Sequence, residues 1–437
     1  MARIAPRFSR VEPRRHARDL VLGMLAGLAR TNCWTVAEHA GNARPGGLQH
    51  LLAAARWDAD GVRDDLRDYV LEHLGDPDAV LVVDETGDVK KGTKSVGVQR
   101  QYTGTAGRIE NSQVAVYLAY AAPAGCAFVD RALYLPKSWT RDPDRMAAAG
   151  VPSGTEFATK PALARAMIAR SLDAGVPAGW VTGDEVYGQD PQLRADLITR
   201  GVAHVLAVSR EHRVATGIGI RGAVDVAVRL PTSAWQPLSA GAGAKGERVY
   251  NWALVDLRIE GTASKASIEA ANGCHQLLLR RNRRTGEMAF YRVWTPRPVP
   301  LQRLVTVAGT RWSIEEGFQT GKELTGLDQH QVRTWTSWHR WTTLALLAHA
   351  FLTVLAATHP TNQKPIDQTP SEPASQPLPD TGRKLISLTR NEIRRLFVAL
   401  IPPATRTLEA IIHWSRWRRR HQAIAKTCHY RRQKCLT

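Results

Sequence analysis

The chain has 437 residues, of which 43% are hydrophobic, and its formal net charge is +19. It is longer than the roughly 250–300 residues at which one hydrophobic core stops growing, so two or three domains are expected. The hydrophobic content is ample for folded cores, and the excess of positive charge favours a phosphate-rich partner over a merely solvated basic surface.

Three further features limit the cellular setting. The N-terminal sequence MARIAPRFSR contains no apolar signal region. The longest apolar run, Leu344–Ala357, is too short to cross a bilayer. The five cysteines form no CxxC pair, so no disulfide framework is indicated. We therefore expect a cytoplasmic, nucleoid-associated protein with no membrane partner.

Residues 1–76 are predicted to form a helical, DNA-binding region. Apolar residues between Ala17 and Leu28 recur every three or four positions, as on one face of a helix. Thr35 and Glu38 resemble a capping box that opens a short helix, which stops at Gly41. This turn has some helix-turn-helix character, although a plain helical bundle gives the same pattern.

Residues 77–210 predict a mixed α/β sheet. Ala79–Val83 is a continuous aliphatic run, which is typical of a strand buried on both faces. Successive strands followed by alternating helices and strands indicate such a sheet. The other strands are expected at 113–120, 127–135, 180–183 and 203–208, and the helices at 160–173 and 191–200.

The remainder divides by composition into four segments. Residues 211–300 are rich in strand patterns and are expected to form a β-rich insertion, after which 301–357 are predicted to be helical. Residues 358–382 contain six prolines and predict a linker. Residues 383–437 carry 14 Lys or Arg and two acidic residues, a net charge of +12, which is typical of a nucleic-acid-binding tail.

Acidic residues follow two of the predicted strands. Asp84 and Glu85 follow the first strand, and Asp184 and Glu185 follow the strand at 180–183. Because neighbouring side chains of a strand point to opposite faces, only one carboxylate of each pair can face a common site if the strand continues. Each pair alone is weak evidence for such a site.

A third acidic segment, TRWSIEEGFQTGK, is predicted to be a helix. With about 100° between residues, Arg311, Glu315 and Lys322 share one stripe, whereas Glu316 lies on another face. An ordinary salt bridge between Arg311 and Glu315, four positions apart, explains the same spacing equally well.

These residues carry a family resemblance. The chain resembles DDE-type transposases of the insertion sequence 701 family, which is related to the insertion sequence 4 group with its signature Tyr-x2-Arg-x3-Glu-x6-Lys. Arg311, Glu315 and Lys322 match the last three positions, but Ala308 stands in place of the tyrosine. The stretch 84–120, the GDEVYG string and the RWRRRHQA tail are also similar to this family.

The resemblance implies an RNase H-like catalytic core interrupted by the β-rich insertion. It also implies that Asp84, Asp184 and Glu315 are the catalytic residues and hold two Mg²⁺ ions, for which Mn²⁺ can substitute. Hard carboxylate oxygens suit Mg²⁺, and a pair of such ions can stabilise both the attacking and the leaving oxygen of a phosphodiester.

Basic residues near these acids are expected to bind DNA phosphates. Arg311 and Lys322 are the first candidates, and Lys160 is a weaker one, as are Lys90 and Lys91. The expected partners are double-stranded DNA, both transposon ends and target, and a second copy of the chain in a synaptic homodimer.

The predicted activity is metal-dependent strand cleavage and strand transfer in cut-and-paste transposition. One alternative is a catalytically inactive, domesticated DNA-binding relative. The other is a haloacid-dehalogenase-like phosphatase, suggested by Asp84-x-Thr86, but that motif requires a second Asp where Thr86 stands.

Overall fold

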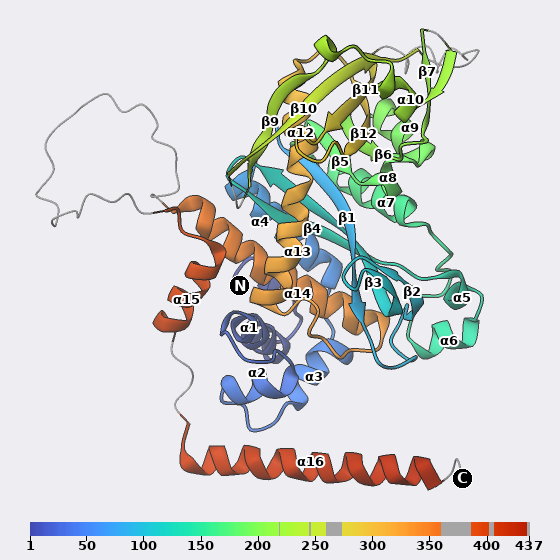
Figure 1. The fold of residues 1–437 in the computed structure, drawn as a ribbon. Coiled ribbons are helices and arrows are strands. Elements are labelled where there is room, and N and C mark those ends of the chain that lie inside the picture. Colours follow the sequence, from blue (N-terminus) through green and yellow to red (C-terminus); the bar gives the residue numbers. More distant parts are fainter. Residues whose placement is uncertain (218, 244–245, 259–272, 360–385, 402–405, 435–437) are drawn as a thin grey trace, which may run out of the picture.

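The computed structural model describes residues 1–217, 219–243, 246–258, 273–359, 386–401 and 406–434 (Figure 1). Its centre is a large mixed sheet in which β4 pairs with β3, β3 with β1, β1 with β5, and β5 with β6. The first three strands are antiparallel, and β5 and β6 run parallel to β1. This order confirms the predicted mixed α/β core. The strands are β1 (Val80–Val89), β3 (Arg108–Ala122), β4 (Gly125–Leu133), β5 (Trp180–Gly183) and β6 (Ala203–Val208).

The first strand does not end at its acidic residues, which is where the sequence pattern placed its end. Pairing of β1 with β5 stops at Val83, but pairing with β3 continues as far as Val89. Asp84 therefore lies directly after the last parallel pair and inside a strand that continues on one side only. A further strand that was not predicted from the sequence, β2 (Gln99–Thr103), pairs with the first half of β3.

The β-rich segment extends this same sheet. β12 pairs antiparallel with β6, and β11, β10 and β9 follow in order outward from it (upper part of Figure 1). A separate buried cluster beneath these strands includes residues of the small β7–β8 hairpin and of α10. The elements are β7 (Arg213–Thr216), β8 (Gly219–Gly222), α10 (Ala223–Val228), β9 (Gln236–Gly243), β10 (Gly246–Asp256), β11 (Cys274–Arg281) and β12 (Met288–Thr295).

Helices connect the strands of the core sheet. α7 joins β4 to β5, and α9 joins β5 to β6. These crossovers are what allow β5 and β6 to run parallel to β1. In chain order the helices after β4 are α5 (Lys137–Thr140), α6 (Pro143–Ala148), α7 (Lys160–Asp173), α8 (Glu185–Gly188) and α9 (Pro191–Thr199).

The predicted acidic helix is broken at Arg311, its second residue. Arg311 ends α12 (Leu301–Thr310) and at the same time caps α13 (Trp312–Thr325). Its backbone stays helical, with φ −50° and ψ −37°, so the predicted stripe of side chains survives the break. α13 ends at Gly326, whose positive φ of 64° is a conformation that favours glycine.

α14 (Trp335–Thr358) is the central helix of the molecule (Figure 1). Among the described residues it alone is long and apolar enough to cross a membrane, although the apolar run in the sequence is shorter than the helix. However, 67% of its apolar window is buried inside the protein, where it packs against α4 and β4. α14 is therefore a helix of the hydrophobic core.

Three of the N-terminal helices, α1, α3 and α4, pack on α14, whereas α2 packs on α1 and α3, and all four share one buried cluster with the core. They are α1 (Val11–Leu25), α2 (Cys33–His39), α3 (Gly46–Ala53) and α4 (Ala59–Leu74). The capping box of α2 differs from the predicted one, because Asn32 is the N-cap and Thr35 is its reciprocal partner. Asn32 provides the side-chain oxygen that caps the helix, so Thr35 is displaced into the first turn.

Two helices follow the predicted linker, which from residue 360 to residue 382 lies outside the described residues. α15 (Arg390–Leu400) packs on α14, where Phe397 contacts Phe351. α16 (Leu408–Lys434) lies along α2 at the edge of the molecule (Figure 1). Its Trp414 is buried, and Trp417 packs edge-on against Trp34.

Candidate active site

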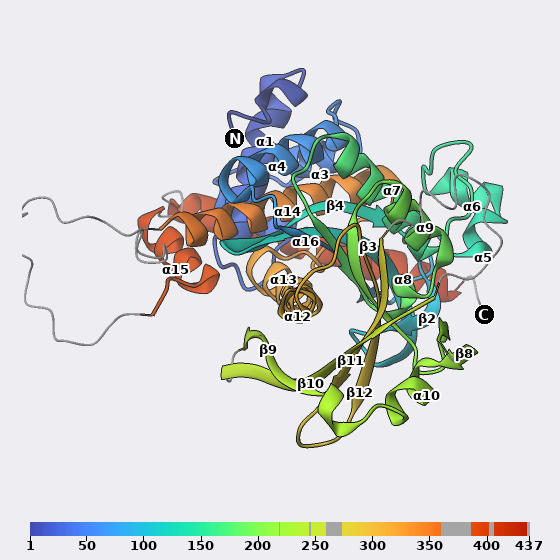
Figure 2. The same cartoon turned by 90° about the horizontal axis from the view of Figure 1, so that it is seen from above.

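A cavity of about 1150 Å³ lies between the helical half of the molecule and the β9–β12 strands. Figure 2 shows α12 and α13 running between these two parts. The cavity brings together residues from segments that are more than 200 positions apart in the chain. They include five of the six predicted site residues, Asp84, Asp184, Arg311, Glu315 and Lys322.

Asp84 is the most deeply placed of these acids. Its Oδ1 accepts a hydrogen bond from the Glu85 backbone N–H at 2.8 Å, and its Oδ2 lies 3.4 Å from Arg311 Nη1. Burial raises the pKa of Asp84 to about 7, with a further increase from the charge of Asp184. Arg311 opposes this shift but does not cancel it. The carboxylate is therefore held where additional positive charge would stabilise it.

Asp184 lies at the end of β5, as predicted, and is the N-cap of α8. Its side chain accepts a hydrogen bond from the Val186 N–H at 2.9 Å, which holds the carboxylate at the start of the helix. Burial raises its pKa, and the neighbouring Glu85 raises it further. The far end of α8 lies close against β6, since a Cβ at Gly188 would be only 1.8 Å from the Ala207 carbonyl oxygen.

The third acid and both predicted cations come from the α12–α13 region. Arg311 Nη2 donates to Glu315 Oε1 at 2.7 Å, so one guanidinium contacts both Asp84 and Glu315. Lys322 Nζ donates to Thr86 Oγ1 at 2.8 Å and to Thr105 Oγ1 at 3.2 Å. Its ammonium therefore lies at the wall of the same cavity, beside β1.

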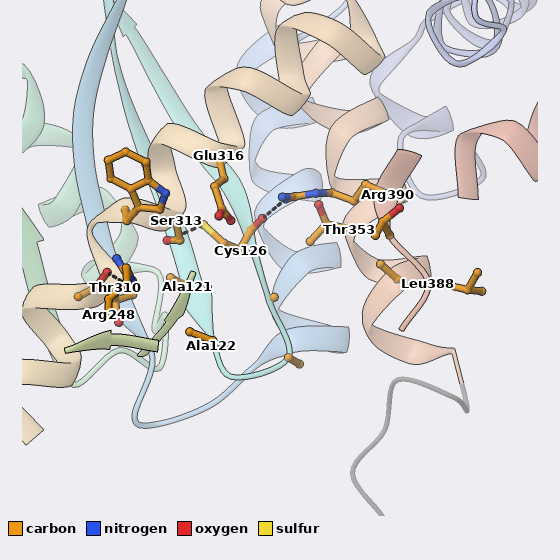
Figure 3. A pocket seen from close by; sticks show the side chains of 17 residues that line it. Ala121, Ala122, Cys126, Arg248, Thr310, Ser313, Glu316, Thr353, Leu388 and Arg390 are labelled. Atoms are coloured by element: carbon orange, nitrogen blue, oxygen red, sulfur yellow. Dashed lines mark hydrogen bonds between the residues drawn. The ribbon is translucent and has the colours of Figure 1, made fainter. Parts of the chain in front are cut away.

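Glu316 belongs to a different cavity, of about 450 Å³, on the other side of α13. Figure 3 shows it beside Ser313, Cys126 and Arg390. Ser313 Oγ lies 3.3 Å from Cys126 Sγ, and Arg390 donates to the Cys126 carbonyl at 3.4 Å. The two adjacent glutamates thus face different surroundings, and only Glu315 lines the cavity that holds Asp84 and Asp184.

Lys160 is not among the residues that line the main cavity. Its Nζ donates to Glu85 Oε1 at 2.6 Å, so its charge is paired inside the protein. No local pattern in the sequence marks this pair, because its two residues lie 75 positions apart. Lys90 likewise donates to the His330 carbonyl at 3.2 Å, whereas Lys91 is exposed.

The arrangement fits a divalent cation in its chemistry. Asp84, Asp184 and Glu315 offer the hard oxygen ligands that Mg²⁺ prefers, and burial together with the nearby charge of Asp184 raises the pKa of Asp84. In the part of the chain that the structure describes, however, no three Asp, Glu, His or Cys side chains are grouped closely enough to hold an ion. Arg311 lies between Asp84 and Glu315 and occupies one oxygen of each carboxylate, Oδ2 of Asp84 and Oε1 of Glu315.

One wall of the cavity was not predicted from the sequence. It is formed by β10 and β11 of the insertion, with Arg248, Tyr250, Trp252 and Arg280 among its residues. The Arg280 guanidinium lies 4.8 Å from the centre of the Tyr250 ring. The sequence indicated strands here, but nothing in it showed which of their faces meets the acids.

Comparison with known proteins gives two matches in sequence. Residues 3–217 match the family model described as DDE superfamily endonuclease. The probable transposase for insertion sequence element IS701 from Microchaete diplosiphon is 28% identical over 197 residues, which is 45% of this chain and 49% of that protein. The aligned part thus covers about half the length of this curated relative.

Two solved structures also show partial likeness. The piggyBac transposase in a synaptic complex with hairpin DNA is 10% identical, with a TM-score of 0.41, and the match covers 90% of this chain and 74% of that one. The NurA nuclease from Sulfolobus solfataricus is 10% identical, with a TM-score of 0.26, and covers 58% and 80%. Both TM-scores are too low to support a conclusion about fold or function.

Proposed function

We propose that this chain, which belongs to the DDE superfamily endonucleases, is a DNA transposase that cuts and rejoins the ends of its own insertion sequence. The observation that carries the proposal is the convergence of Asp84, Asp184 and Glu315 on one cavity. The family model spans the first two of these acids and stops before the third. Glu315 is therefore assigned from its spacing and from its place in the cavity.

The three carboxylates would hold two Mg²⁺ ions, and Mn²⁺ would substitute for them. Bound there, such ions supply a nucleophilic oxygen and stabilise the leaving oxygen of the phosphodiester. The protein's own part is to place the acids and to bind the DNA. Arg311 and Lys322, on either side of Glu315, would contact the phosphates that flank the scissile bond.

Double-stranded DNA, both the transposon ends and the target, is the proposed substrate. The net charge of +19 supports this, because each phosphate neutralised by Lys or Arg releases a counterion. The insertion contributes Arg248 and Arg280 to the wall of the same cavity. Two DNA ends must be brought together for transposition, so the active form proposed is a homodimer.

A catalytically inactive, DNA-binding relative is the alternative. It would need the basic surface but would have no use for three acids around one cavity. Burial, and then the charge of Asp184, raise the pKa of Asp84, so holding this carboxylate ionised in the cavity is unfavourable in the absence of a cation. A protein without catalysis would gain nothing from this arrangement, so the geometry favours the enzyme.

The test is cleavage of linear DNA that carries the inverted repeats flanking the gene. Mg²⁺ or Mn²⁺ should support nicking at the repeat ends, whereas Ca²⁺ or excess chelator should not. Asp84→Asn, Asp184→Asn and Glu315→Gln should each bind the DNA but fail to cut it. Undiminished cutting in chelator would rule out the metal mechanism, and DNA binding with no cutting under any condition would favour the inactive relative.

A further inference from the structure

Both oxygens of the Glu85 carboxylate are held by helices distant in the sequence. Oε1 accepts a hydrogen bond from Lys160 Nζ at 2.6 Å, and Oε2 accepts one from the Tyr187 hydroxyl at 2.5 Å. Tyr187 is fully buried, and the side chains of Lys160 and Glu85 are only 23% and 17% exposed. These three residues, here called the Glu85 cluster, join β1, α7 and α8.

The Glu85 cluster connects the two elements that carry the first two acids. Glu85 directly follows Asp84 on β1, and Tyr187 lies one turn after Asp184 on α8. α8 has only four residues, so a bond at Tyr187 restrains the whole helix, including its N-cap. Gly188 is pressed against β6 on the other side. The separation of Asp84 and Asp184 is thereby fixed from both sides.

We propose that Glu85 and Tyr187 are positioning residues for the catalytic acids, and that Lys160 serves to neutralise Glu85 and does not bind DNA phosphate. The proposal rests on the proposed function and deepens it. Ligands of a metal site depend on such supporting interactions, and removing one typically costs about 10–100-fold in metal affinity or activity.

The charge of Lys160 matters because Glu85 lies beside two other carboxylates. Glu85 adds to the electrostatic repulsion felt by both Asp84 and Asp184. Removing one partner of a largely buried ion pair leaves the other charge uncompensated, which is strongly unfavourable. Removing Lys160 alone should therefore disturb the site more than removing both charges together.

This last expectation separates two roles for Lys160. If the lysine neutralises Glu85, the double variant Lys160→Gln/Glu85→Gln should recover much of what Lys160→Gln loses, since a glutamine oxygen can still accept the hydrogen bond from Tyr187. If Lys160 instead binds a phosphate, removing the charge of Glu85 cannot restore the affinity for DNA.

The experiment compares wild type with Tyr187→Phe, Lys160→Gln, the double variant and the control Tyr69→Phe, which lies on α4 outside the site. Mn²⁺ affinity of the DNA-free protein is measured by electron paramagnetic resonance, beside DNA affinity, its salt dependence and the rate of strand cleavage. Tyr187→Phe should lose about 10–100-fold in Mn²⁺ affinity and in cleavage rate. Its DNA affinity should stay within about twofold of the control, because its hydroxyl binds Glu85 inside the protein.

Lys160→Gln should lose cleavage to a similar extent, because the uncompensated Glu85 carboxylate can then compete with Asp84 and Asp184 for the ion. The double variant should regain at least half of that loss on a logarithmic scale. The proposal is overturned if Tyr187→Phe matches the control in both measurements. It is equally overturned if Lys160→Gln lowers DNA affinity and the salt slope while the double variant restores neither. If wild type cuts no DNA but Mn²⁺ affinity still follows this pattern, the proposed function fails and the Glu85 cluster stands.

Discussion

At the scale of single residues, the site is defined by how its acids share positive charge. Arg311 contacts Asp84 and Glu315 with one guanidinium, and Lys160 neutralises Glu85. Asp184 is held differently, by a hydrogen bond from the backbone of α8. The cavity therefore combines buried carboxylates with too few cations, a condition that binding of a divalent ion would relieve.

The unfavourable burial of the Asp84 carboxylate should appear directly in the pH dependence of the free energy of unfolding. The pKa of Asp84 rises from its ordinary value of 3.8 to about 7 in the folded protein. Above pH 4 the unfolded chain loses this proton before the folded chain does, so the contribution of Asp84 to stability falls as pH rises from about 4 to 7. By about pH 8 the loss is on the order of 4 kcal/mol.

Asp84→Asn should consequently unfold at higher denaturant concentration than wild type at about pH 8, in the absence of divalent metal. The gain should shrink steadily as pH is lowered toward about 4, because the wild-type carboxyl is then protonated in the folded state. Chemical unfolding of both proteins across this pH range provides the measurement. A gain that does not depend on pH would show that burial of this carboxylate is not the cause.

The adjacent glutamates of α13 give a second test at this scale. Glu315→Gln should reduce strand cleavage by more than roughly 100-fold, since it removes a proposed metal ligand and not merely a supporting interaction. Glu316→Gln is the matched control, because that side chain lies in the cavity beside Cys126. It should cleave at a rate close to that of wild type. Cleavage by Glu315→Gln together with inactivity of Glu316→Gln would reverse the assignment.

At the scale of elements, the sequence predicted best those helices and strands that a local pattern of residues determines. The buried run before Asp84 predicted β1, and the spacing of Arg311, Glu315 and Lys322 predicted their common face. Pairings between distant segments were not predictable. The continuation of β1 to Val89 depends on pairing with β3, and the ion pair of Lys160 depends on the position of Glu85. Neither partner is marked by local propensity or periodicity.

The C-terminal helices illustrate the same limit. Net charge predicted a basic tail separated from the core, but α15 and α16 bury Ile393 and Trp414 against the rest of the protein. Trp414 also donates a hydrogen bond to the Asn42 carbonyl, and Arg418 is paired with Glu38. Deleting the tail would therefore expose apolar surface on α2 and α14. Replacing surface charges of the tail tests its predicted DNA binding better than deletion does.

Arg416, Arg419 and Arg420 lie exposed on α16 and provide that test. Replacing all three by Gln should weaken DNA binding and reduce the slope of log affinity against log salt by about 2.7, roughly 0.9 for each phosphate that is no longer neutralised. Arg418→Gln is the control, because its guanidinium is already paired with Glu38. An unchanged salt slope in the triple variant would show that α16 does not bind DNA.

At the scale of the whole molecule, the fold brings distant parts of the chain to one place. The core sheet supplies two acids, the helices after the insertion supply the third, and the insertion forms the opposite wall. Because the insertion strands extend the core sheet through β6, the wall and the acids belong to one continuous sheet framework (Figure 1). DNA held between them would meet basic residues on both sides.

Metal binding by Asp84, Asp184 and Glu315 at one site can be tested by metal-directed cleavage of the protein itself. Fe²⁺ bound in place of Mg²⁺, with ascorbate and peroxide, generates radicals that cut the nearest backbone, and mass spectrometry locates the cuts. A shared site predicts cuts near residues 84, 184 and 315 in wild type, all of them absent from the Asp84→Asn/Asp184→Asn variant. Cuts confined to other segments, or cuts near 315 that persist in that variant, would contradict a shared site.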